Sequence, residues 1–290
     1  MLLTSPIGSH TSTSGGLAKT GLPYADAAGS QAIQVYVSNS RGWALPPGDP
    51  KQDTLFRDGI GERGVPAYIH ASLLVNLGSP TALTLERSVD VLEHALRRGA
   101  AIGASGVVYH AGSSVDPAHD AKAMHQLHEA LLPLLDRAAS GGLPKLLVEP
   151  SAGGGRSLAS KVHDLAPYLD AVERHPWLGV CFDTCHAWAA GHDLATPGGM
   201  TATLDALVAA AGPGRLQLIH ANDSKDDRGS TRDRHETIGQ GRIGAAAFGE
   251  LLAHPAVAGL PVIVETPTEK HVGHAADIAL LKSLLPEQRS

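Results

Sequence analysis

Nine histidine and carboxylate side chains of this sequence have the residue types and the placement of metal ligands. Each stands at the end of a short apolar run or in the segment that follows it, where a charged group is unfavourable unless it is paired or bound to metal. Imidazole nitrogens and carboxylate oxygens suit Zn²⁺ and Mn²⁺, and nine ligands suit two or three ions. The candidates are His70, His110, Glu149, Asp183, His186, His220, Asp233, His235 and Glu265.

Bound zinc would remove the need for a protein nucleophile. It lowers the pKa of its water to about 7, which makes hydroxide available at neutral pH. The sequence contains neither a G-x-S-x-G elbow nor a Walker A motif. We interpret Cys181 and Cys185, which lie beside Asp183 and His186, as small packing residues, and the glycines at 153–155 as a turn.

Eight short runs rich in Val, Ile and Leu predict the strands that must position these ligands. They cover residues 7–10, 32–38, 67–72, 106–112, 145–151, 178–184, 216–223 and 261–267. Helical periodicity fills most intervals, notably 86–103, 121–139, 158–175 and 275–288. Alternating strands and helices indicate a parallel sheet, and strands this apolar are buried on both faces. The sequence therefore predicts an α/β fold, a single (β/α)8 TIM barrel with parallel strands and outer helices.

The barrel would bring the candidates together, because the carboxyl ends of its strands share one face. We find no domain linker, and we expect one domain over residues 1–290, with 1–6 as a flexible N-terminal extension. The Gly/Pro-rich patches 46–50, 152–155 and 196–199 and the charged stretch 223–236 fall in predicted loops after strands.

Composition indicates a cytoplasmic protein. No apolar run is long enough to span a membrane, the first residues lack the features of a signal peptide, and two cysteines are too few for a disulfide framework. The formal charge of -6 argues against binding nucleic acid through bulk basicity, unless divalent cations supply positive charge. Nothing in the sequence requires a partner subunit, so we expect a monomer.

Several long segments resemble the endonuclease IV family, in the same order along the chain. They are HASLLVNLGSP (70–80), VCFDTCHAWAAGHDL (180–194), HANDSK (220–225) and DRHETIGQGRIG (233–244), with further matches at 7–17, 109–113, 148–155 and 264–267. The resemblance implies a zinc-dependent deoxyribonuclease IV of DNA repair. Such an enzyme hydrolyses double-stranded DNA 5′ to an abasic site, leaving 3′-hydroxyl and 5′-deoxyribose phosphate ends, and also removes 3′-blocking groups.

The resemblance also implies how three zinc ions share the candidates. His70, His110 and Glu149 hold the first ion; Glu149, Asp183, His220 and Glu265 hold the second; His186, Asp233 and His235 hold the third. Glu149 and Glu265 are the expected catalytic residues, Glu149 by bridging two ions and Glu265 by orienting the attacking hydroxide. Mn²⁺ or Fe²⁺ compete for such sites.

The segment 38–47 resembles the loop with which the family penetrates DNA. It offers Asn39, Arg41 and Trp43, with Arg41 at the penetrating position. Leu73 stands where the family often has an aromatic wedge, and leucine can also wedge between bases. Ala71 replaces a commonly acidic residue, which with Leu73 predicts a different handling of the orphan base. Pro150 and Ser151 stand where Asn-Thr is usual and predict altered hydrogen bonds around the metals.

Two other functions are compatible with parts of this pattern. A metal-dependent sugar isomerase or epimerase on the same barrel would use Glu149, Asp183, His220 and Glu265, but would leave the other five candidates without a role. A metal-binding or DNA-binding protein without catalysis would not need the carboxylates of the second group, which are present.

Overall fold

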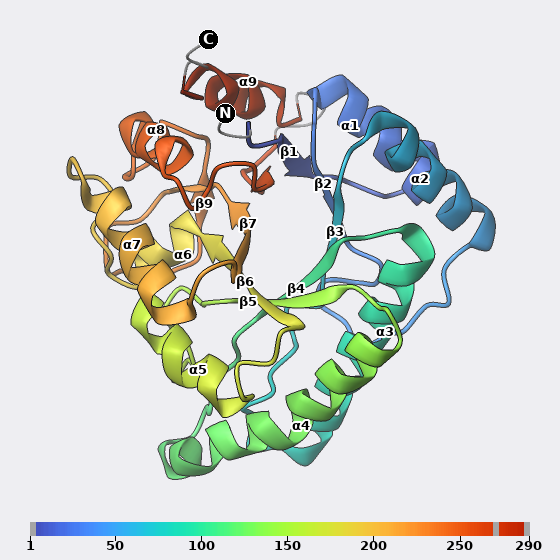
Figure 1. The fold of residues 1–290 in the computed structure, drawn as a ribbon, viewed down its shortest axis with the longest axis vertical. Helices are drawn as coiled ribbons and strands as arrows, with labels where there is room; N and C mark the ends of the chain where they lie inside the picture. Colours follow the sequence, from blue (N-terminus) through green and yellow to red (C-terminus); the bar gives the residue numbers. More distant parts are fainter. Residues whose placement is uncertain (1–3, 269–272, 287–290) are drawn as a thin grey trace.

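Eight parallel strands close into a barrel in the computed structural model, which describes residues 4–268 and 273–286 (Figure 1). The spatial order is β1-β10-β7-β6-β5-β4-β3-β2, and β1 closes the ring by pairing with both β10 and β2. The predicted fold class and all eight predicted strands are confirmed. The strands are β1 (Ile7–His10), β2 (Ile33–Val35), β3 (Ala67–His70), β4 (Gly106–His110), β5 (Lys145–Glu149), β6 (Leu178–Asp183), β7 (Leu216–His220) and β10 (Val262–Val264).

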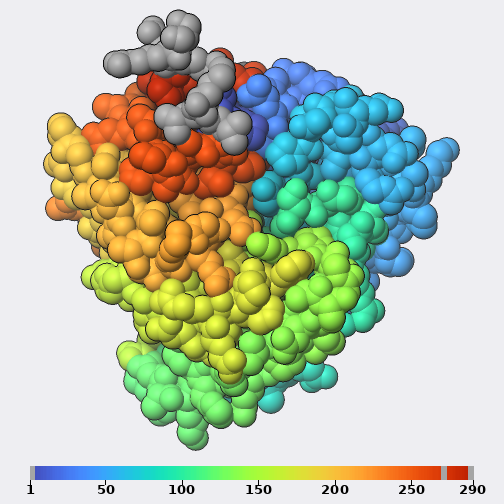
Figure 2. Space-filling view, in the orientation of Figure 1, coloured from blue at the N-terminus to red at the C-terminus, as the bar shows by residue number. Residues whose placement is uncertain are grey.

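Helices surround the barrel, and the surface segments follow one another round the molecule in chain order (Figure 2). The α-helices are α1 (Leu22–Ala28), α2 (Pro50–Arg63), α3 (Ala82–Ile102), α4 (Asp120–Ser140), α5 (Leu165–Ala171), α6 (Thr184–Ala189), α7 (Gly199–Ala211), α8 (Ala245–Ala253) and α9 (Ala275–Ser283). Short helices of other types are η1 (Leu17–Gly21), η2 (Pro117–His119) and η3 (Val162–Asp164). None of the helices within the described residues is long and apolar enough to cross a membrane.

The helix predicted at 158–175 is shorter than its periodicity suggested. Leu158 N donates to Gly112 O over 2.9 Å, which ties the start of this segment to the loop after β4. Asp164 then accepts hydrogen bonds from Ser160 N and Lys161 N, so regular helix begins only after them, with η3 and α5. Long-range pairing therefore replaces the first helical turn.

The charged stretch 223–236 is not simply a loop. It contains a short antiparallel pair, β8 (Asp223–Ser224) and β9 (His235–Glu236), that the sequence pattern did not predict. A two-residue strand carries too little periodicity to be recognised, and its partner lies across the intervening turn.

The chain before β1 is attached to the barrel where the structure describes it. Residues 1–3 of the predicted flexible extension lie outside the described residues. Ser5 is buried, its hydroxyl donates to Val257 O over 2.7 Å, and Pro6 O accepts from Val262 N. Residues 5 and 6 are therefore packed against the chain around β10 rather than free.

Two apolar clusters form the core. The larger lies between the strands and the outer helices. The smaller fills the barrel interior and takes one side chain from each of seven strand segments: Ala32, Tyr68, Val108, Leu147, Cys181, Leu218 and Ile263. The eighth strand contributes Gly8, where a Cβ would lie only 1.7 Å from Ala32 O. Close approach of β1 and β2 therefore requires glycine at this position.

A buried ion pair joins α2 to α3 and should contribute measurably to stability. Arg98 forms a bidentate pair with Asp53 and also donates to Pro47 O; the two residues are 8% and 6% exposed. Arg98→Met leaves the Asp53 carboxylate buried without its cation. We expect urea titration to show a loss of roughly 3–5 kcal/mol in the free energy of unfolding.

Arg97→Met is the matched control, because Arg97 is the neighbouring residue and its side chain is 72% exposed in an i,i+4 pair with Glu93. Such exposed pairs contribute about 0.3–0.5 kcal/mol. Equal losses in the two variants would show that the buried pair has no special role.

Candidate metal centre

Every strand places one side chain at the carboxyl end of the barrel interior. Because side chains alternate between the two faces of a strand, the residue two positions after a barrel-core residue also faces inward. Advancing two positions from Gly8 and from each member of the inner cluster gives the set that we call the upper ring. Its members are His10, Gln34, His70, His110, Glu149, Asp183, His220 and Glu265. Six of the eight are predicted ligands.

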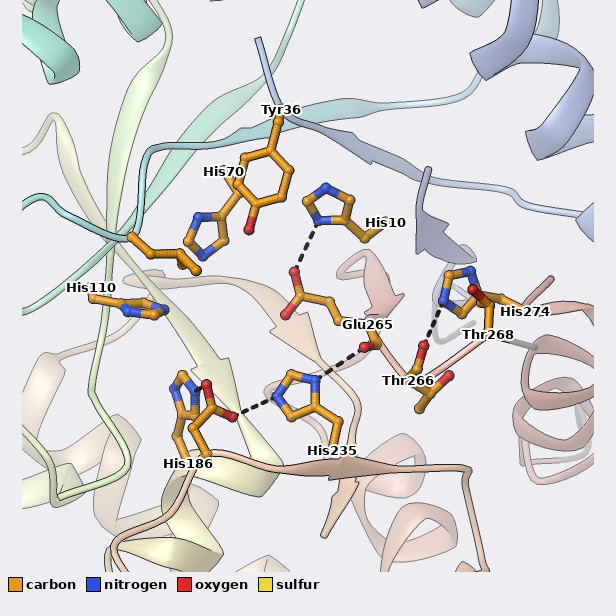
Figure 3. A pocket seen from close by; sticks show the side chains of 12 residues that line it. His10, Tyr36, His70, His110, His186, His235, Glu265, Thr266, Thr268 and His274 are labelled. Carbon is orange, nitrogen blue, oxygen red and sulfur yellow. Dashed lines mark hydrogen bonds and ion pairs between the residues drawn. The ribbon is translucent and has the colours of Figure 1, made fainter. Parts of the chain in front are cut away.

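The three remaining predicted ligands come from segments after β6 and β7. His186 lies in the first turn of α6, which Asp183 caps by accepting from His186 N over 2.8 Å. Asp233 lies just before β9, and His235 begins that strand. Figure 3 shows His186 and His235 facing the same cavity as His70, His110 and Glu265. The cavity has a volume of about 310 Å³.

Glu149 is the centre of the cluster. It is fully buried, and its Oε2 lies 3.4 Å from His70 Nε2 and 3.7 Å from His110 Nε2. Its other oxygen, Oε1, lies 3.1 Å from His220 Nδ1. One carboxylate thus faces two sets of imidazoles, which is the arrangement that a bridging ligand requires.

Asp233 and His235 complete a third group. The Asp233 carboxylate lies 3.2 Å from His186 Nε2 and 2.9 Å from His235 Nε2. In three adjoining groups the candidate ligand atoms all lie within 4.8 Å of one another. These groups are His70, His110 and Glu149; Asp183, His220 and Glu265; and Asp183, His186 and His235. The structure therefore brings all nine predicted ligands together.

Backbone carbonyls set the orientation of three of the histidine rings. Nδ1 of His70 is 2.7 Å from Ala71 O, Nδ1 of His186 is 3.0 Å from Pro150 O, and Nδ1 of His235 is 3.1 Å from Glu265 O. A carbonyl only accepts, so Nδ1 carries the proton and Nε2 faces the carboxylates. Because these contacts use the main chain, the side-chain departures at Ala71 and Pro150 leave them intact.

Burial and charge oppose each other in the cluster. Burial raises the pKa of Asp183 and would raise that of Glu149, but nearby His220 and His186 hold the pKa of Glu149 well below its usual range. Burial lowers the pKa of His110 to about 4. The carboxylates raise the pKa of His186 well above its ordinary value in spite of burial. In the absence of metal, imidazolium groups thus compensate the buried carboxylates.

The donor set fits metal ions. Two buried atoms, Glu149 Oε2 and His235 Nε2, have no hydrogen-bond partner among the described residues, although opposite charges lie within ion-pair distance. Unsatisfied buried polar atoms are uncommon and need an explanation. A cation among these nitrogen and oxygen atoms would satisfy both and would replace the protons on the histidines.

The two cysteines are buried, as expected for packing residues. Each has its sulfur within 4.8 Å of ligand atoms of the cluster. Burial raises the pKa of the Cys181 thiol to about 12 and also raises that of Cys185. Thiolate is therefore the disfavoured form, and Cys181 belongs to the apolar interior of the barrel.

Of the four predicted DNA-contact residues, one lines the cavity and the other three lie in a neighbouring loop, residues 38–47. Asn39 and Arg41 are exposed, whereas Trp43 is half-buried against the core beneath the Arg87 guanidinium. Leu73 lines the cavity and is 37% exposed. The two loops are joined, because Leu73 N donates to Ser40 O over 2.8 Å and the Ser72 hydroxyl lies 3.0 Å from Gly42 O.

Sequence reasoning missed several residues around the cavity. His10 and Gln34 occupy the upper ring, and Tyr36 packs its ring against those of His10 and His70 and lines the cavity. Counting two positions from Gly8 and Ala32 would have found His10 and Gln34. Thr266 and His274 also line the cavity, and no sequence pattern indicates them.

The chain is similar to known proteins over nearly its whole length. The family model described as xylose isomerase-like TIM barrel matches residues 22–284. A Streptomyces coelicolor protein named probable endonuclease 4 is 53% identical over 279 residues, which cover 96% of this chain and 95% of that protein. A protein of the same name from Methanoculleus marisnigri is 36% identical over 282 residues, covering 96% and 98%.

The chain is also similar in structure to solved proteins. Endonuclease IV from Thermus thermophilus superposes with a TM-score of 0.82 at 33% identity and covers 96% of this chain and 98% of that one. A D-tagatose 3-epimerase-like protein superposes with a TM-score of 0.70 at 17% identity, covering 96% and 95%. The second likeness shows a shared fold.

The ionisation of His235 predicts how the stability of the metal-free protein depends on pH. Burial lowers its pKa, but contact with Asp233 and the charge of Asp183 outweigh burial and raise it from 6.5 to about 9. A group with a raised pKa stabilises the fold fully below its unfolded value and loses this contribution as pH rises through its folded value. We expect the Tm of chelator-treated protein to fall between about pH 6.5 and about pH 9.

His235→Asn should flatten this dependence, leaving only the part due to other buried histidines of raised pKa such as His186. His163→Asn is the control, since the His163 side chain is 72% exposed and should leave the curve unchanged. Scanning calorimetry measures Tm at each pH. If Tm of His235→Asn depended on pH as strongly as that of the wild-type protein, His235 would not be the source of the dependence.

Proposed function

The chain belongs to the endonuclease IV family, and from this premise we propose that it is a DNA-repair hydrolase that cuts double-stranded DNA 5′ to abasic sites. Its products are 3′-hydroxyl and 5′-deoxyribose phosphate ends, and it also removes 3′-blocking groups. The observation that carries the proposal is the set of three adjoining ligand groups at the open end of one barrel.

We assign three zinc ions to the nine candidate ligands. His70, His110 and Glu149 would hold one ion, Glu149, Asp183, His220 and Glu265 a second, and His186, Asp233 and His235 a third. When bound, the ions supply an activated water at neutral pH and positive charge for the phosphate. Mn²⁺ or Fe²⁺ at some positions would serve the same purpose.

The chain's own residues position this chemistry. Glu149 presents its two oxygens to different histidines and so fixes the spacing of the first two sites. Glu265 lines the cavity and is accessible from it, with its side chain 15% exposed, so it is placed to orient the attacking water. Three histidine rings are locked by main-chain carbonyls, which reduces the freedom that each would lose on binding an ion.

The rim loops fit a DNA substrate. An enzyme acting on an abasic nucleotide must draw it out of the stack and fill or pry open the gap. Arg41 is exposed for a phosphate or stacking contact on the loop that is hydrogen-bonded to Leu73, and Asn39 lies two residues before it. Leu73 is the apolar wedge, and Trp43 supports the loop from below. A single chain supplies all of these residues, and we also propose that the protein is a cytoplasmic monomer.

A sugar isomerase or epimerase is the alternative. It accounts for Glu149, Asp183, His220 and Glu265 but not for the third group, in which Asp233 contacts both His186 and His235. The likeness to the D-tagatose 3-epimerase-like protein is limited to the fold at 17% identity. The third group therefore favours the nuclease.

Metal analysis combined with cleavage tests the proposal directly. We expect about three zinc ions per chain and incision on the 5′ side of a single abasic site in a duplex. Chelation should abolish incision, and added zinc should restore it, because the metals supply the activated water. Sequencing gels that resolve the 3′-hydroxyl end identify the cut. One or two metals, no incision, and turnover of a ketose would instead support the isomerase.

Arg41→Ala tests the rim loop. Loss of a charge-assisted contact costs roughly 1.5–3 kcal/mol, so we expect at least about tenfold weaker binding to an abasic duplex. The slope of log Kd against the logarithm of the salt concentration should decrease by about 1, which corresponds to the loss of one phosphate contact. Arg57→Ala is the control, because Arg57 donates to Ala101 O near the amino end of β4, on the opposite side of the barrel. Equal effects of both variants would argue against a DNA contact at Arg41.

A further inference from the structure

Two members of the upper ring have no role in the ligand assignment. β1 supplies His10 and β2 supplies Gln34, and the two residues are directly paired in register. Gln34 is fully buried, although its side chain carries an uncharged amide that must find partners at this depth. Its contacts are to two of the assigned ligands.

The Gln34 amide joins His220 to Glu265. Its Nε2 donates to Glu265 Oε1 over 2.6 Å, and its Oε1 lies 2.9 Å from His220 Nε2. His10 Nδ1 lies 3.0 Å from the same Gln34 nitrogen and 3.1 Å from Glu265 Oε1 (Figure 3 shows the second contact). Gln34 and His10 thus hold Oε1 of Glu265. The other oxygen of Glu265, Oε2, lies 3.4 Å from His220 Nδ1.

The chemistry of these contacts fixes the direction of the amide. A carboxylate oxygen only accepts, so the Gln34 atom beside Glu265 must be the donating nitrogen. The Gln34 oxygen therefore faces His220 Nε2 and accepts from it. His220 therefore keeps a proton on Nε2, and Nδ1, which lies 3.1 Å from Glu149 Oε1, is the nitrogen left to bind a metal ion.

His220 differs in this respect from the other oriented histidines. His70, His186 and His235 each direct Nδ1 to a main-chain carbonyl and Nε2 to a carboxylate of the cluster. His186 Nδ1 also lies 3.2 Å from Glu149 Oε1. His220 presents Nδ1, and the group that receives its Nε2 proton is a side chain that mutation can remove.

We propose that Gln34 is a positioning residue for the second metal ion. It sets the tautomer of His220 and holds one oxygen of Glu265, so that His220 Nδ1 and Glu265 Oε2 are presented together to one ion. This role rests on the proposed metal centre, whereas the hydrogen bond between His220 Nε2 and Gln34 Oε1 is a property of the metal-free protein.

Gln34→Met keeps the approximate volume and removes both hydrogen bonds. We expect zinc titration against a chromophoric chelator to show one of three sites weakened by roughly 10–100-fold, with the other two unchanged. In ¹⁵N-resolved spectra of the metal-free protein, the His220 Nε2–H signal should be lost or exchange faster with solvent, because its acceptor Gln34 Oε1 is gone. Gln126→Met is the matched control: the Gln126 amide donates to Leu77 O and Ser79 O, away from the cavity, and its loss should change neither readout.

Gln34→Glu separates the two contacts and also serves if Gln34→Met does not fold. An ionised glutamate still accepts from His220 Nε2 but cannot donate to Glu265, so the protected Nε2–H signal should be retained while zinc binding is weakened. Wild-type zinc affinity together with an unchanged His220 signature in Gln34→Met would overturn the proposal, as would a weakened site in Gln126→Met. If the wild-type protein binds no zinc or does not cut abasic DNA, the proposed function fails, and the His220 spectra still decide the role of Gln34.

Discussion

The alternation of side chains along eight parallel strands is the constraint on which this site depends. In a closed barrel the inward positions of all strands converge, so a residue's parity in its strand decides whether it reaches the interior. Apolar residues such as Leu147 and Leu218 fill one level, and the next inward positions are Glu149 and His220. Register brings the functional positions directly together, as Asp183 pairs with His220 and His110 with Glu149. A shift of one residue in β5 would turn Glu149 toward the helices.

This placement imposes an electrostatic demand that the rest of the cluster meets. Two carboxylates of the ring, Glu149 and Asp183, are at most 2% exposed, and burial of such charges without compensation is strongly unfavourable. Without metal, histidines compensate them, which is why the pKa of His186 is raised despite its burial. Cations would take over that role and release the histidines as neutral ligands. The same positive charge would allow a chain with a net charge of -6 to approach a phosphate backbone.

The sequence predicted what depends on local pattern. Each barrel strand is an apolar run of its own, and a charged residue at its end is conspicuous, so the strands and the gathering of nine ligands could be predicted. Gln34 was missed because a single amide within an apolar strand resembles a tolerated polar residue. Only the alternation of side chains along the strand shows that it faces the barrel interior. The pair β8 and β9 was missed because strands of two residues carry too little periodicity to be recognised. The start of the segment at 158 was misjudged because Leu158 N donates to Gly112 O, a contact between residues far apart in the sequence.

The barrel and the loops contribute different parts of the site. Strand ends alone provide Glu149, Asp183, His220 and Glu265, the set that sugar isomerases on this barrel also employ. Asp233 and His235 instead depend on the segment after β7, which a buried carboxylate organises: Asp223 accepts from the main-chain N–H groups of Gly239, Gly241, Ile243 and Gly244. That carboxylate fixes the chain after β9 and so holds His235 over the barrel opening. The feature that favours phosphodiester hydrolysis over sugar chemistry therefore resides in a loop that the buried Asp223 carboxylate holds in place. Differences in such loops allow one fold to support different reactions.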